Sequence, residues 1–242
     1  DIPIEIPRRL KINDKIISDY KSYEELTPKQ VIAYSSQVGA SKIAIMLGYE
    51  KLKDAYYNFG FGKPISINFP SSAFGLMNIK DKISDKELAS LGYGYGLTIS
   101  PFQITSAYSV FANKGIYKDF KILKTDEVGL KRVISEDSAK HTLEALKEVV
   151  HIGTGKNADI NGYTEGGKTG TVHKTSYGNG YAEDSYRASF VGIAPLSDKS
   201  LTIFVSIDEP GLNAYSGGMI AAPLFKKIAD SSLNYLGYSE DE

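Results

Sequence analysis

The segment Gly166-Gly167-Lys168-Thr169-Gly170-Thr171 places one ammonium and two hydroxyl groups among small residues. In an extended strand, the glycine between the threonines would let another backbone lie close against the chain. Such a strand can pair with the main chain of an extended peptide while the ammonium and hydroxyls hold its carboxylate. The segment therefore favours recognition of a carboxylate-bearing peptide, although an ordinary glycine-rich turn before a strand has the same composition.

The same glycines also satisfy the phosphate-loop pattern G-x-x-x-x-G-K-[ST], through Gly162, Gly167, Lys168 and Thr169. Downstream, an apolar strand ends in Asp208-Glu209, where a nucleotide hydrolase would hold magnesium. A phosphate loop, however, joins a buried strand to a helix. Residues 156–161 are mostly polar, and residues 171–181 contain two glycines and no helical apolar period. The context therefore disfavours a nucleotide hydrolase, which stays an alternative.

Composition is that of a globular protein: 42% of the 242 residues are hydrophobic, 24% are charged and the net charge is −1. With no basic cluster, nucleic acid is not an expected partner. There is no cysteine, and His141, His151 and His173 lack metal-ligand spacing, so no metal site or cofactor is predicted. No apolar run approaches the ~18 residues that span a bilayer. The chain opens at Asp1 without a signal peptide, as a fragment would.

Most helix signals lie in the first two thirds of the chain. Thr27-Pro28 predicts a helix start, and a second helix is expected to end at Gly48, with Ser35-Ser36-Gln37 at the junction between the two. Ser100 to Gln103 forms a capping box that begins another helix. Further helices are expected at 52–59, from Ser135 to about Val150, and at 223–236, with a loop running to Phe74 and a hairpin at 120–133.

Strand candidates gather in the last third, at 168–174, 189–193 and 201–207. An antiparallel sheet from these segments, covered by helices, predicts an α+β fold. Residues 1–22 are expected to be an irregular lead-in with short extended pieces.

Two short motifs together change this interpretation. A serine acyl-transfer enzyme with a lysine base uses S-x-x-K, S-x-N and K-T-G in that order. Ser35-Ser36-Gln37 and Lys168-Thr169-Gly170 stand in the order of the second and third motifs. The chain thereby resembles the transpeptidase domain of class B penicillin-binding proteins, most closely the division-specific (septal) type. Matching segments lie at 25–27, 35–44, 59–62, 94–103, 112–115, 153–155, 166–171, 189–195, 217–218 and 222–223.

This resemblance implies a penicillin-binding, serine β-lactamase-like transpeptidase fold, incomplete at its N-terminus, with residues 23–237 as its core. It also implies peptidoglycan D,D-transpeptidation: a serine attacks the D-Ala-D-Ala bond of a stem peptide, and an amine on a neighbouring stem accepts the acyl group. β-Lactam antibiotics would acylate the same serine. The family acts without a metal or cofactor, on the outer face of the bacterial inner membrane, with cell-division membrane proteins as partners.

The resemblance also assigns roles to individual residues. Lys168, Thr169 and Thr171 would bind the substrate carboxylate, and the backbone N–H of Thr171 would contribute to an oxyanion hole. Ser35 would relay a proton, and Gln37 stands where asparagine is usual. The remaining members of the two motifs, Ser36 and Gly170, are expected to contact substrate.

One departure concerns the nucleophile. The family's S-x-x-K motif is expected roughly fifty residues before the second motif, whereas 34 residues precede Ser35. Ser18-Asp19-Tyr20-Lys21 matches formally, but polar residues follow it, so a buried lysine base is not expected there. We interpret this match as chance and expect a partial domain without turnover. A non-catalytic peptidoglycan-binding module is a further alternative.

Overall fold

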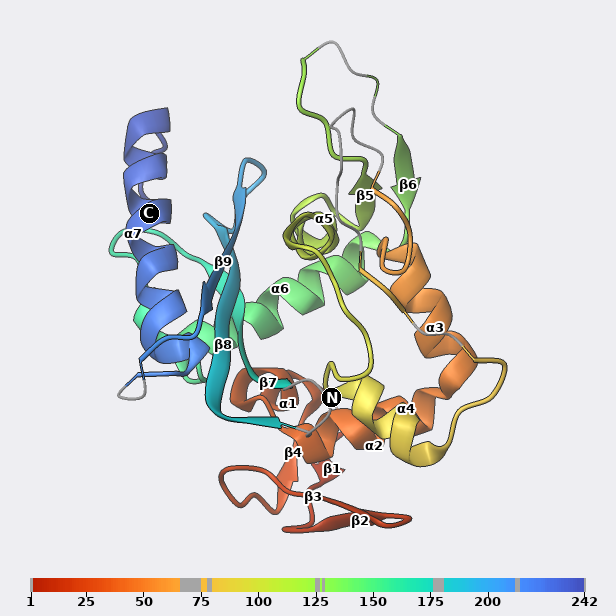
Figure 1. Cartoon of the computed structure of the whole chain (residues 1–242). Coiled ribbons are helices and arrows are strands. Elements are labelled where there is room, and N and C mark those ends of the chain that lie inside the picture. The colour runs from red at the N-terminus through yellow and green to blue at the C-terminus, as the bar shows by residue number, and fades with distance from the viewer. Residues whose placement is uncertain are drawn as a thin grey trace.

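The computed structural model describes residues 2–65, 75–77, 80–124, 127, 129–175, 181–211 and 214–241. The side chains of residues 175 and 181–184 lie outside this description. Most of the predicted loop running to Phe74 also falls outside the described residues. Within the described part the architecture is α+β, as predicted (Figure 1).

The largest sheet consists of β7 (Gly166–Thr175), β8 (Tyr181–Ala194) and β9 (Leu201–Asp208), antiparallel in the order β7-β8-β9. All three predicted strands are present, but β8 begins at Tyr181 and not at Ser189. Its early part pairs with the end of β7, His173 opposite Tyr186, beyond the buried core. The sequence of this early part carries no clear apolar alternation, which is the pattern that a strand with one buried face shows.

Seven helices are described, and their ends follow local capping chemistry. The helices are α1 (Pro28–Tyr34), α2 (Gln37–Leu47), α3 (Tyr49–Asn58), α4 (Asp85–Gly92), α5 (Pro101–Ala112), α6 (Glu136–His151) and α7 (Ala222–Leu236). Ser100 completes the predicted capping box, and Thr27, predicted as a helix cap, also forms one with Gln30. Helix α4 was not predicted, although Ser84 and Glu87 form a third capping box at its start.

Short strands and turns complete the chain. The predicted extended pieces near the N-terminus are β1 (Ile4–Glu5), β2 (Leu10–Ile12) and β3 (Lys15–Ile17); β1 pairs with β4 (Glu25–Leu26) and β2 with β3. The predicted hairpin is confirmed as β5 (Ile116–Lys118) with β6 (Leu130–Arg132), although it begins before residue 120. A 3₁₀ turn, η1 (Lys156–Ala158), and a π-helical turn, η2 (Gly217–Ala221), lie near the sheet.

Buried side chains form two hydrophobic clusters. One lies between the sheet and α7, where the Phe190 and Phe225 rings are 4.9 Å apart. The other joins β1–β4 to α1, α2 and α4 through residues such as Ile6 and Val38. In Figure 1, α7 lies on one side of the sheet and α5 on the other, with α1 and α2 below β7.

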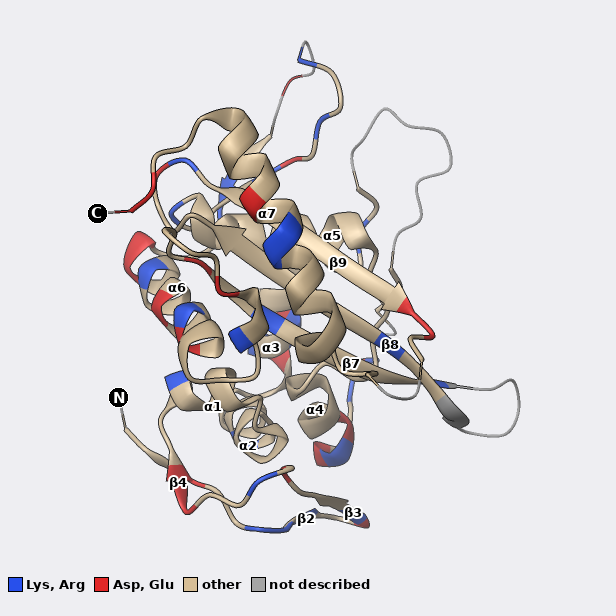
Figure 2. Ribbon diagram, turned by 90° about the vertical axis from the view of Figure 1, so that its left-hand side faces the viewer, with Lys and Arg blue, Asp and Glu red and all other residues tan. Residues whose placement is uncertain are grey.

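Acidic and basic residues alternate along α6 in Figure 2. Within the described residues, no helix combines the length and apolarity needed to span a bilayer.

Candidate functional site

The two sequence motifs meet at one contact. Lys168 of β7 donates a hydrogen bond from Nζ to Ser35 Oγ, at 2.7 Å, across 133 residues of sequence. Ser35 is the C-cap of α1 and has a left-handed backbone, with φ 58° and ψ 42°. A non-glycine residue held in that region is strained, and such strain concentrates at functional sites. The junction between two helices thus presents a hydroxyl directly to the strand lysine.

The Lys168 ammonium occupies a poorly solvated position. Burial lowers its pKa to about 8, because a desolvated ammonium loses part of its hydration energy. Its other hydrogen bond goes to the carbonyl of Thr169, at 3.2 Å. Near neutral pH the group therefore keeps its positive charge but releases a proton more readily than an ordinary lysine, which suits both anion binding and proton transfer.

The two threonine hydroxyls lie on one face of β7, each against a different loop. Thr169 Oγ1 is 2.7 Å from Thr154 Oγ1, and Thr171 Oγ1 accepts a hydrogen bond from the Gly217 N–H at 3.0 Å. A Cβ on Gly217 would lie 2.5 Å from the Gly170 carbonyl oxygen, so only glycine allows this approach. Three segments therefore converge on the lysine–threonine strand.

β7 is an edge strand of the described sheet, with β8 on one side and no strand partner on the other among the residues described. Its outer edge can accept the main chain of an extended ligand by β-augmentation. Lys168, Thr169, Gly170 and Thr171 all lie along it.

Ser36 and Gln37 do not contact Lys168 as Ser35 does. The Ser36 side chain is 2% exposed; its hydroxyl donates to Asp19 Oδ2 at 2.5 Å and accepts from the Gly39 N–H at 2.9 Å. It is the N-cap of α2 and offers substrate no free hydroxyl. Gln37 is exposed in the first turn of α2. Their assigned roles in substrate contact stay predictions.

The phosphate-loop alternative is wrong in its structural context. Lys168 and Thr169 lie within β7 and do not open a helix. Asp208 and Glu209 both accept from Lys174 Nζ, at 3.0 and 2.6 Å, and Asp208 also pairs with Arg187. Both carboxylates are thus paired with basic side chains and not arranged as magnesium ligands.

The formal S-x-x-K match at Ser18–Lys21 lies in the loop after β3, where both Ser18 and Lys21 are exposed. A lysine base needs burial to lower its pKa, so the interpretation of this match as chance agrees with the structure.

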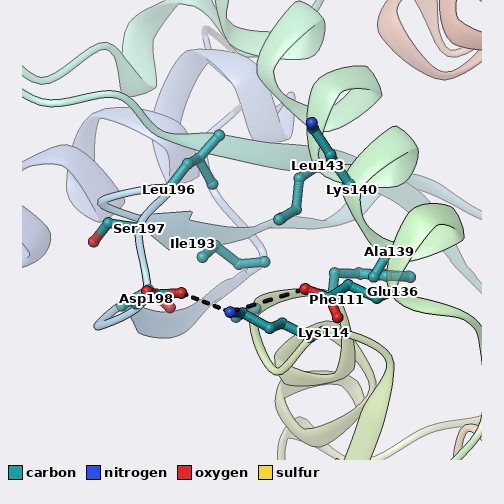
Figure 3. A pocket seen from close by; sticks show the side chains of 12 residues that line it. Phe111, Lys114, Glu136, Ala139, Lys140, Leu143, Ile193, Leu196, Ser197 and Asp198 are labelled. Carbon is teal, nitrogen blue, oxygen red and sulfur yellow. Dashed lines mark ion pairs between the residues drawn. The ribbon is translucent and has the colours of Figure 1, made fainter.

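A separate pocket of about 230 Å³ lies between α5, α6 and the end of β8 (Figure 3). Lys114 crosses it and pairs with Asp198 at 3.1 Å and with Glu136 at 3.8 Å. Because Lys114 is already paired with two carboxylates and neither motif lines the pocket, it is not the candidate site.

Glu165, the residue before β7, gives a testable pH dependence. Its side chain is 4% exposed and accepts from the Ile160 N–H, and burial raises its pKa to about 7, with Asp159 and Asp241 adding to the rise and Lys226 opposing it. The unfolded chain loses this proton near its ordinary pKa of 4.5. Stability therefore falls as pH rises from 4.5 to about 7, by up to about 2–3 kcal/mol.

We expect Glu165→Gln to remove this loss, measured as the free energy of unfolding in urea across that pH range. Asp208, whose pKa is lowered by its hydrogen bond to Lys174, titrates below this pH range and so does not contribute to the slope. An unchanged slope in the variant would show that Glu165 is not the titrating group.

Two residues at the site were missed by sequence reasoning. Thr154 belongs to a segment that was recognised, 153–155, but no role was given to its hydroxyl. Asp19 lay inside a match interpreted as chance. Neither carries a local signal, because each acts through a contact made by tertiary packing.

Comparison with protein families and solved structures fits this geometry. The family profile described as the penicillin-binding protein transpeptidase domain matches residues 5–230. A probable peptidoglycan D,D-transpeptidase, PbpC of Pseudomonas aeruginosa, is 35% identical over 237 residues, covering 97% of this chain and 42% of the relative. The peptidoglycan D,D-transpeptidase FtsI of Escherichia coli K12 is 34% identical, covering 96% of this chain and 40% of that protein. The chain thus spans about two fifths of these curated relatives.

Among solved structures, the apo transpeptidase domain of penicillin-binding protein 3 from Burkholderia pseudomallei has a TM-score of 0.93 at 33% identity, covering 100% of this chain and 74% of that one. Penicillin-binding protein 3 from Mycobacterium tuberculosis, complexed with aztreonam, has a TM-score of 0.90 at 27% identity, covering 100% and 59%. The predicted transpeptidase fold is confirmed.

Proposed function

This chain belongs to the penicillin-binding protein transpeptidase domain family, and from that premise we propose that the whole protein carrying it is a peptidoglycan D,D-transpeptidase of the septal class. Its substrate is the D-Ala-D-Ala end of a stem peptide, and β-lactams compete for the same cleft. The observation that carries the proposal is the 2.7 Å contact between Ser35 and Lys168 on β7, an edge strand of the sheet as far as the chain is described.

The proposed mechanism assigns one task to each group. The Lys168 ammonium and the Thr169 and Thr171 hydroxyls hold the terminal carboxylate of the donor peptide, whose main chain pairs with β7. The nucleophile of the whole protein is a serine outside the residues described above. As its ester forms, the proton bound for the departing D-alanine amine passes through the Ser35 hydroxyl, which Lys168 orients. The Gln37 amide, at the start of α2, binds the peptide backbone.

The remaining inferences about the whole protein rest on its family. It acts at the outer face of the bacterial inner membrane, together with cell-division membrane proteins. Aztreonam in the Mycobacterium tuberculosis relative supports β-lactam binding at this fold.

The test is intact mass after incubation with excess benzylpenicillin, applied to this chain and to the whole protein. We expect one covalent adduct on the whole protein and none on this chain. No adduct on the whole protein would contradict transpeptidation and, if stem peptide still bound, would favour a non-catalytic module. An adduct on this chain at Ser18 or Ser35 would instead make that residue the nucleophile.

A further inference from the structure

Asp19 holds the loop that presents Ser35. It lies after β3, 17 residues before Ser36 in sequence. Its two carboxylate oxygens accept different hydrogen bonds, Oδ2 from the Ser36 hydroxyl at 2.5 Å and Oδ1 from the Val38 N–H at 3.1 Å. Both donors belong to the first turn of α2, immediately after Ser35. A separate segment of the chain therefore fixes the beginning of α2.

The same segment also contacts the residue on the other side of Ser35. Tyr23, four residues after Asp19, stacks on Tyr34 with ring centroids 5.3 Å apart and planes 11° from parallel. Burial and the nearby Asp19 carboxylate raise the pKa of Tyr23. The residues before and after Ser35 are thus both held by the stretch 19–23.

The backbone at Ser35 is tied to α1, since the Ser35 N–H donates to the Ile32 carbonyl at 3.2 Å and the Ser36 N–H to the Val31 carbonyl at 3.0 Å. The Ser35 side chain is exposed, its backbone is left-handed, and its hydroxyl has Lys168 as its hydrogen-bond partner. No spacer separates it from either helix, since α1 ends at Tyr34 and Ser36 caps α2. A rotation of the Ser36 peptide would therefore carry the Ser35 hydroxyl away from the lysine. Strained backbone of this kind persists only where neighbouring groups determine it.

We propose that Asp19 is a positioning residue for the serine–lysine pair: it anchors Ser36 and Val38 and thereby keeps the Ser35 hydroxyl on Lys168. A carboxylate suits this task because both donors need an acceptor, and an asparagine offers only one oxygen. Its negative charge also lies at the N-terminus of α2, where the helix dipole favours an anion. The proposal rests on the transpeptidase function proposed above.

The variant is Asp19→Asn. The matched control is Asp14→Asn, because Asp14 lies nearby in the turn between β2 and β3 and its carboxylate pairs with Lys86 at 2.8 Å, away from α2. The first measurement is the pKa of Lys168 in this chain, determined by NMR titration of its side-chain carbon and nitrogen signals. Releasing the junction lets water reach the ammonium, so Asp19→Asn should raise this pKa from about 8 toward 10.5, and Asp14→Asn should not.

The second measurement is the benzylpenicillin acylation rate of the whole protein. We expect Asp19→Asn to lower it about 10- to 100-fold, the range that small misplacements near reacting groups produce. Asp14→Asn should leave it unchanged. If Asp19→Asn does not fold, Ser36→Ala removes one of the two anchors and should show the same two changes to a smaller degree.

A loss of unfolding free energy in Asp19→Asn, with both the Lys168 pKa and the acylation rate unchanged, would overturn the proposal and leave Asp19 a helix cap. If the wild-type whole protein forms no adduct, the transpeptidase function fails, and the Lys168 titration in this chain still decides whether Asp19 positions the pair.

Discussion

Lys168→Met should lower the rate of β-lactam acylation of the whole protein by roughly 100- to 1,000-fold, because one half-buried cation both binds the carboxylate and orients Ser35. Methionine keeps the length and apolar stem but has no charge. At the same time we expect the variant to be more stable than the wild type below pH 8, by about 1–2 kcal/mol, since the lowered pKa shows that the ammonium is held at a cost.

The sign of this stability difference follows from the two titrations. The folded protein loses the Lys168 proton near pH 8 and the unfolded chain near 10.5, so the wild type gains stability as pH rises between these values. The difference between variant and wild type should therefore shrink over that interval. Urea unfolding at a series of pH values measures it.

Lys174→Met is the matched control, because Lys174 lies on the same strand but pairs with Asp208 and Glu209 at the far end. It should leave acylation near the wild-type rate. Equal losses in the two variants would mean that the strand as a whole, and not the Lys168 ammonium, is what acylation requires.

Local chemistry allowed much of the fold to be predicted. Thr27-Pro28 and Ser100-Pro101 begin helices because side-chain caps and proline act within a single turn. The near-continuous apolar run of β9 likewise predicts a strand from neighbouring residues alone. Helix α4 is an exception: it was not predicted, although Ser84 and Glu87 form a capping box as clear as the others.

The candidate site could be predicted only in part. The order of the two motifs was sufficient to predict that Ser35 and the lysine–threonine strand belong together, and the structure places Lys168 on Ser35. The resemblance assigned proton relay to Ser35 and a substrate contact to Ser36, but the motif carries no sign that the Ser36 hydroxyl is buried. Only the fold shows that one hydroxyl faces the strand while the other caps a helix. Asp19 and Thr154 were beyond prediction because their partners lie 17 and 15 residues away.

Phe225→Ala should have the largest effect on stability, lowering the free energy of unfolding by about 3–5 kcal/mol. Phe225 is fully buried and packs against Phe190 beneath the sheet. The two rings occupy space that paired glycines leave open: a Cβ on Gly167 would lie 2.4 Å from Phe190 Cζ, and one on Gly192 would lie 2.6 Å from Phe225 Cε2. Removing one ring therefore opens a cavity directly behind the strand that carries Lys168.

Leu224→Ala is the control, since Leu224 neighbours Phe225 on α7 but is 39% exposed. It should cost about 1 kcal/mol or less in urea unfolding at neutral pH. Amide exchange in β7 should also quicken in Phe225→Ala and not in Leu224→Ala, because the strand would lose its backing. Similar costs for the two variants would mean that the glycine pair and the two rings do not form the packed support of the site.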